Sequence, residues 1–163
     1  MTFNIGYMSK GIKFEMLNGT KLKIGVVYTR WNAHIVHPLL DGCVSALEKS
    51  GVKKKNIKTL EVAGSFELPF AAKHLIESKK KFDAIVVLGC LIKGETMHFE
   101  YIADAVAHGL MELNVDEDVP VIFGVLTCLN EAQAKARCTG KNNHGIGWGY
   151  TAVEMGLLKR SKI

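Results

Sequence analysis

The chain has 163 residues, enough for one ordinary domain with a sizeable core. Hydrophobic residues make up 48% and charged residues 23%, which excludes a disordered tail, a collagen-like fibre and a coiled-coil rod. The formal net charge of +5 is modest and dispersed. The lysine runs at 53–55 and 79–81 follow apolar periodic segments, and no aromatic residues alternate with them. We therefore interpret them as solvated helix ends rather than a nucleic-acid-binding patch.

The cysteines and the N-terminal residues indicate a compartment. The four cysteines are Cys43, Cys90, Cys128 and Cys138. None of them forms a Cys-x-x-Cys pair, so neither a zinc ribbon nor a thioredoxin-like site has support. No signal peptide and no apolar stretch of about 20 residues is recognisable. We expect free thiols, a cytoplasmic location, and neither membrane nor nucleic acid as a partner.

Strand and helix patterns alternate along most of the chain. Residues 1–22 lack clear periodicity and predict an N-terminal arm, ordered only by a partner, before a domain at 23–163. Apolar runs predict strands at 24–28, 57–62, 83–91 and 121–126. Apolar residues at helical spacing predict helices at 33–49, 66–78, 99–113, 131–138 and 148–159, with a polar turn over 139–149.

This alternation implies right-handed crossovers and a parallel sheet with helices on both faces. In such sheets ligands bind at the carboxyl ends of the strands. The loops after Tyr28, Val62, Leu91 and Leu126 are therefore the candidate binding loops.

The first two loops each allow a functional and a structural interpretation. Trp31 can present a flat apolar face to a ligand, and Asn32 can hydrogen-bond the edge of a heterocycle. Alternatively, Trp31 covers the core and Asn32 is a helix N-cap. In the second loop Gly64 and Ser65 let a ligand approach the backbone, while Glu67 either binds that ligand or favours the helix dipole.

The third loop is the richest in chemistry. Residues 94–96, Gly-Glu-Thr, can form an anion-binding concavity of backbone N–H groups. His98 stands at a helix start, where the dipole favours a neutral imidazole that can take and return protons. A structural role is the alternative for this histidine.

The fourth region closes its predicted helix with Arg137, whose guanidinium can hold a phosphate or simply lie on the surface. Lys141 and His144 are available in the following turn. His34 and His37 lie three residues apart, but no third ligand is evident, so we expect no zinc site. No phosphate-binding glycine loop, dinucleotide motif or serine-hydrolase elbow is present.

These four ordered motifs resemble the 6,7-dimethyl-8-ribityllumazine synthase family over residues 23–160. The anchors are Arg30-Trp31-Asn32, the segment 64–69, the segment 94–100, the segment 123–127 and Arg137. The resemblance implies a three-layer α/β/α sandwich with a four-stranded parallel sheet in the flavodoxin-like order 2-1-3-4. It also implies an enzyme, a transferase of riboflavin biosynthesis. That enzyme joins 5-amino-6-(D-ribitylamino)uracil to 3,4-dihydroxy-2-butanone 4-phosphate without a metal or organic cofactor.

The resemblance also assigns roles to residues. His98 would transfer protons, and Trp31 and Asn32 would contact the pyrimidine. Glu95, Thr96 and Arg137 would hold the phosphate, and Phe123 would come from a neighbouring subunit. The remaining substrate contacts would be Ser65, Phe66, Glu67, Leu91 and Ile92.

The family implies a homo-oligomer, a pentamer or a multiple such as a decamer or an icosahedral shell, with association with riboflavin synthase as a further expectation. Two departures from the common pattern are Lys93, where many relatives have Arg, and Asn143-His144-Gly145, where many have Lys-Gly. They leave the roles of Lys141 and His144 open.

The alternative functions are a shell or flavin-binding protein without turnover and a flavodoxin-like electron carrier.

Overall fold

The computed structural model describes residues 14–161. It contains a four-stranded sheet in the order β2-β1-β3-β4, and every pairing is parallel. The strands are β1 (Ile24–Thr29), β2 (Ile57–Val62), β3 (Ala84–Ile92) and β4 (Val121–Cys128). The predicted fold and strand order are confirmed.

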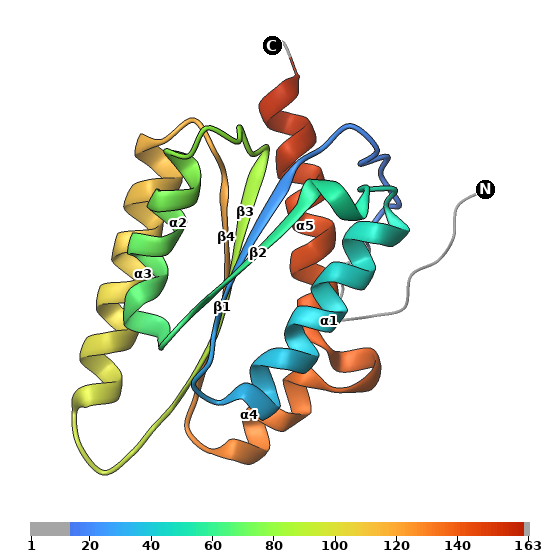
Figure 1. Cartoon of the computed structure of the whole chain (residues 1–163). Helices are drawn as coiled ribbons and strands as arrows, with labels where there is room; N and C mark the ends of the chain where they lie inside the picture. The colour runs from blue at the N-terminus through green and yellow to red at the C-terminus, as the bar shows by residue number, and fades with distance from the viewer. Residues whose placement is uncertain (1–13, 162–163) are drawn as a thin grey trace.

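Two helical layers enclose the sheet (Figure 1). One layer holds α2 (Leu68–Ile76) and α3 (His98–Asp116). The other holds α1 (Ala33–Lys49), α4 (Glu131–Cys138) and α5 (His144–Arg160). Residues 84–90 of β3 are all buried, as a continuous apolar strand covered on both faces should be. Two apolar clusters, one on each face of the sheet, form the core.

The start of α5 differs from the sequence prediction. The segment 139–149 was expected to be a turn, but the helix begins at His144 after a short 3-10 turn, Gly140–Asn142. Asn143 caps it, since its Oδ1 accepts the Gly145 N–H at 2.9 Å and its Nδ2 donates to the Pro38 carbonyl at 2.8 Å. Glycines lower helix propensity, so the sequence pattern hid a helix that tertiary contacts stabilise.

Close packing explains why a glycine lies in this helix. A Cβ atom on Gly145 would lie 2.0 Å from the Leu39 carbonyl oxygen of α1. On Gly149, one turn later, it would lie 2.7 Å from the Cys43 carbonyl oxygen. The missing side chains therefore let α5 approach the backbone of α1.

The predicted N-terminal arm at 1–22 is described only in part, because residues 1–13 lie outside the described residues. From 14 onward the chain contacts the domain. The Gly19 N–H donates to the Ser50 carbonyl at 2.7 Å, Leu22 is fully buried, and the Phe14 ring lies 5.8 Å from that of Tyr150. The boundary between an arm and a domain at 23–163 stays a prediction.

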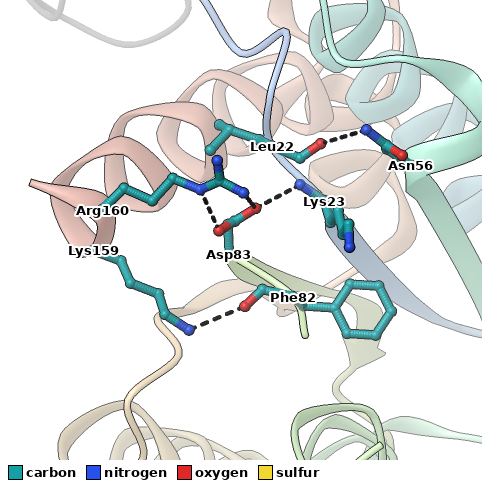
Figure 2. Close-up of polar contacts among 7 residues, drawn as sticks. All are labelled: Leu22, Lys23, Asn56, Phe82, Asp83, Lys159 and Arg160. Atoms are coloured by element: carbon teal, nitrogen blue, oxygen red, sulfur yellow. Dashed lines mark hydrogen bonds and ion pairs between the residues drawn. The ribbon is translucent and has the colours of Figure 1, made fainter. Parts of the chain in front are cut away.

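A polar cluster ties the end of α5 to the amino ends of the strands (Figure 2). The nearly buried carboxylate of Asp83 accepts two hydrogen bonds from Arg160, at 2.6 and 2.8 Å, and one from the Lys23 backbone N–H at 2.7 Å. The hydrogen bond to the Asp83 carboxylate raises the pKa of Arg160. Lys159 donates to the Phe82 carbonyl at 3.1 Å. These contacts anchor the edge of the sheet opposite the candidate binding loops.

Candidate active site

The loop after β1 exposes an aromatic side chain above a rigid turn. Trp31 is 74% exposed, so the alternative in which it covers the core is wrong. Asn32 has a φ of 58° and its side chain makes no cap; instead its amide donates to the Cys90 carbonyl at 2.9 Å. Because β1 ends at Thr29, no residue of that strand pairs with Cys90, and Asn32 bonds the carbonyl there.

The loop after β2 lies beside it, since the Trp31 N–H donates to the Ala63 carbonyl at 3.0 Å. Ser65 is buried, whereas Phe66 is 59% exposed. The exposed Glu67 folds back, and its Oε2 accepts the Gly64 N–H at 2.9 Å. This bond fixes the loop and keeps the Glu67 carboxylate next to the Trp31 loop.

The loop after β3 carries the predicted phosphate contacts and the histidine. Leu91 and Ile92 end the strand and are partly buried, while Glu95, Thr96 and His98 are all exposed. His98 is the first residue of α3, as predicted. These residues thus lie at one exposed edge with Trp31 and Phe66.

The end of β4 forms a separate cavity of about 300 Å³ with α4 and α5. Of the predicted site residues, Phe123 and Arg137 line it. The other lining residues are Val125, Leu126, Thr127, Cys128, Gln133, His144 and Trp148. Arg137 is held in place by a bond from its guanidinium to the Gln133 carbonyl at 2.8 Å. The cavity therefore combines an aromatic ring, a cation and several polar groups.

His144 occupies one wall of this cavity, with its ring edge-on to that of Trp148 at 5.9 Å. Burial and the positive charge of Arg137 lower the pKa of His144. The neutral ring favoured near neutral pH can accept a hydrogen bond as well as donate one.

Sequence reasoning missed Gln133, Thr127 and Trp148 and left His144 open. Helical spacing carried a usable signal, because Gln133 and Arg137 lie four residues apart, as do His144 and Trp148. The second pair was hidden because the helix was expected to begin four residues too late.

Two sets of side chains thus exist on one chain. The first set comes from the loops after β1, β2 and β3, the last two residues of β3 and the first residue of α3. Its members are Trp31, Asn32, Ser65, Phe66, Glu67, Leu91, Ile92, Glu95, Thr96 and His98. The second is the lining of the β4 cavity, drawn from β4, α4 and α5. Aromatic surface, a histidine and a guanidinium can together bind a heterocycle and a phosphate.

The described residues give no sign of a metal centre. Within 14–161 no three His, Cys, Asp or Glu side chains are grouped to hold a metal ion. His34 instead pairs with Glu131 at 2.9 Å. Hydrogen bonds from Lys135, the larger cause, and from His34 lower the pKa of Glu131.

None of the helices in this part of the chain has both the length and the apolar character needed to cross a membrane.

Comparisons with known proteins place the chain among relatives of one name. Residues 21–160 match a family model described as 6,7-dimethyl-8-ribityllumazine synthase. A protein of that name from Schizosaccharomyces pombe is 48% identical, over 91% of this chain and 94% of its own length. One from Pyricularia oryzae is 42% identical, over 93% of this chain and 95% of its own length. One from Parabacteroides distasonis is 43% identical, over 85% of this chain and 86% of its own length.

Proposed function

Because the chain belongs to the 6,7-dimethyl-8-ribityllumazine synthase family, transferases of riboflavin biosynthesis, we propose the following reaction for it. The enzyme condenses 5-amino-6-(D-ribitylamino)uracil with 3,4-dihydroxy-2-butanone 4-phosphate. The products are 6,7-dimethyl-8-ribityllumazine, phosphate and water. The single observation that carries the proposal is the clustering of Trp31, Glu67 and His98 on neighbouring loops at one edge of the sheet.

The pyrimidine substrate binds on the first set of side chains. Trp31, 74% exposed, stacks on the ring, and Asn32 contacts its polar edge. Leu91 and Ile92 border the heterocycle. Ser65 and Phe66 offer backbone groups, and Glu67 accepts hydrogen bonds from ribityl hydroxyls.

The phosphorylated substrate is held by its charged end. The Arg137 guanidinium supplies the cation, and backbone N–H groups of Glu95 and Thr96 supply further donors. Binding both reactants in one geometry supplies most of the rate enhancement, because the amine and the ketone react readily once they are adjacent.

His98 moves protons between the bound reactants. Its imidazole takes a proton from the attacking amine and returns one to the carbonyl oxygen, which leaves as water as the C=N bond forms. It then helps to remove a proton from the carbon next to the imine, and the C–O bond to the phosphate breaks as phosphate leaves. Acid–base catalysis of this kind contributes about 10²–10⁴-fold. No step requires a metal or an organic cofactor.

The complete site forms between two copies of the chain. The β4 cavity with Phe123 and Arg137 contains no residue of the first set among its lining, and Trp31 and Phe66 leave large apolar surfaces uncovered. We propose that a neighbouring copy contributes its cavity to the first set in a pentamer or a multiple of one. Association with riboflavin synthase, in a cytoplasmic setting, belongs to the same proposal.

A direct assay tests the reaction. Purified protein is incubated with both substrates, and lumazine fluorescence is followed against a protein-free control. We expect a rate proportional to protein concentration. A rate equal to the control would favour a shell or flavin-binding protein without turnover, and a yellow protein as isolated would favour a flavodoxin-like carrier.

A further inference from the structure

Lys93 spans the loop that joins β3 to α3. Its backbone N–H donates to the Cys128 carbonyl at 2.9 Å, which fixes the start of the loop against β4. Its ammonium group reaches forward to the other end, where it donates to the Thr96 carbonyl at 3.2 Å and pairs with the Glu100 carboxylate. One side chain therefore connects both ends of the turn at 94–97.

This ion pair is more sheltered than most surface pairs. The side chains of Lys93 and Glu100 are 28% and 41% exposed, against 52% and 62% for Lys73 and Glu77 on α2. The hydrogen bond from Lys93 is the largest cause of a lowered pKa at Glu100. Glu100 also lies in the first turn of α3, where the helix dipole favours a carboxylate.

The pairing leaves one acceptor unused. The second carboxylate oxygen of Glu100, Oε2, is buried and has no hydrogen-bond partner among the described residues. The compact ammonium of Lys93 is engaged with the Thr96 carbonyl and the first oxygen. A guanidinium at this position has donors enough for the carbonyl and both oxygens.

We propose that Lys93 is a positioning residue, which holds the 94–97 turn so that Glu95, Thr96 and His98 face the phosphorylated substrate. The inference rests on the proposed function, since it concerns the same site. It differs from a purely structural role, because the turn carries the groups that bind the phosphorylated reactant, whereas Trp31 and Asn32, which bind the pyrimidine, lie on another loop.

Steady-state kinetics separate these roles. Initial rates are measured while each substrate is varied, for the wild type, Lys93→Met, Lys93→Arg and the control Lys73→Met. We expect Lys93→Met to raise KM for the phosphorylated substrate about tenfold and that for the pyrimidine less than about threefold. Lys93→Arg should stay within about twofold of wild type, and Lys73→Met should be unchanged.

A second variant addresses the pair itself. Glu100→Gln should give a similar KM split, and the double variant with Lys93→Met should be no worse than the more impaired single one. Glu100→Gln also serves if Lys93→Met does not fold, which its thermal melting curve shows. Unchanged KM values, or equal rises for both substrates, would overturn the role of Lys93.

Calorimetric titration with inorganic phosphate gives a readout independent of turnover. We expect Lys93→Met to bind phosphate about tenfold more weakly than the wild type. A wild type that binds phosphate in this way but forms no lumazine would disprove the proposed reaction and leave the positioning role standing. Equal phosphate affinities in wild type and variant would disprove the positioning role.

Discussion

Asn32 combines two tasks at one position. Its left-handed backbone, with a φ of 58°, turns the chain from β1 into α1, and asparagine is among the few residues that adopt this conformation readily. Its amide then bonds the Cys90 carbonyl of β3. The turn that presents Trp31 to solvent is therefore fixed from both sides.

Arg137 provides the first prediction at the residue scale. Arg137→Gln removes the cation but keeps a side chain able to hydrogen-bond, so we expect KM for the phosphorylated substrate to rise about 30-fold or more. That for the pyrimidine should change less than about threefold. Initial-rate measurements with each substrate varied check this, and equal effects on both would contradict a phosphate anchor.

His144 provides a second prediction, on the pH dependence of stability. Its pKa in the folded chain lies below the ordinary value of about 6.5, because burial and Arg137 disfavour the imidazolium. As the pH falls, His144 therefore binds a proton at a higher pH in the unfolded chain than in the folded chain. The contribution of His144 to stability is complete above pH about 7.5 and is lost as the pH falls through about 6.5 toward the lower folded-state pKa.

Urea unfolding between pH 8 and pH 5 measures this effect. We expect the free energy of unfolding of the wild type to fall more steeply with decreasing pH than that of His144→Asn. The difference should be confined to the range below about pH 7. Parallel curves for the two proteins would show that His144 is not responsible.

At the scale of elements, the contact between α1 and α5 depends on Gly145, although glycine lowers the helix propensity of a sequence. Gly145→Ala would place a Cβ 2.0 Å from the Leu39 carbonyl oxygen, so one of the helices must shift. We expect a loss of roughly 2–3 kcal/mol in the free energy of unfolding, measured by urea denaturation. Gly94→Ala is the matched control, since a Cβ there meets no atom within 4 Å and its cost should stay within about 0.5 kcal/mol. Equal losses would disprove the steric explanation.

The elements themselves differ in how far sequence could predict them. The run of β-branched residues in β3 gave the strand to within one residue at each end, because a strand buried on both faces needs such residues. The start of α5 was not predictable in this way. Its stability comes from the Asn143 cap and from contact with α1, which are tertiary features.

At the scale of the whole molecule, the proposed site across two copies makes a prediction about mixtures. His98→Ala damages the first set of side chains and Arg137→Gln damages the cavity. In randomly mixed oligomers of the two variants, about one quarter of the interfaces would pair an intact His98 with an intact Arg137. We expect activity in the mixture well above the average of the separate variants.

The measurement requires joint refolding of the two variants from denaturant, followed by the fluorescence assay. Each variant refolded alone is the control, and light scattering reports the size of the particles. A mixture no more active than the average of its components would show that each chain holds a complete site.

The sequence could predict most of the residues of the first set, together with Phe123 and Arg137 of the cavity. It could not predict how the two sets are arranged relative to each other. Trp31, Glu67 and His98 were identified because they follow strands whose carboxyl ends share one edge. Phe123 and Arg137 fall in one cavity only because β4 and α4 pack together there, and their neighbour His144 enters through the longer α5. In the proposed oligomer the β4 cavity of one copy completes the first set of another. That pairing depends on the contact surface between copies, and the periodicity of apolar residues along one chain does not specify such a surface.

The anchor at Asp83 has a consequence for the order of folding. Its partners Lys23 and Arg160 lie 60 and 77 residues away along the chain. Contacts between such distant residues carry a large loop-closure entropy, so we expect this anchor to form late. Until α5 docks, the face of α1 that it covers stays exposed and can associate with other molecules.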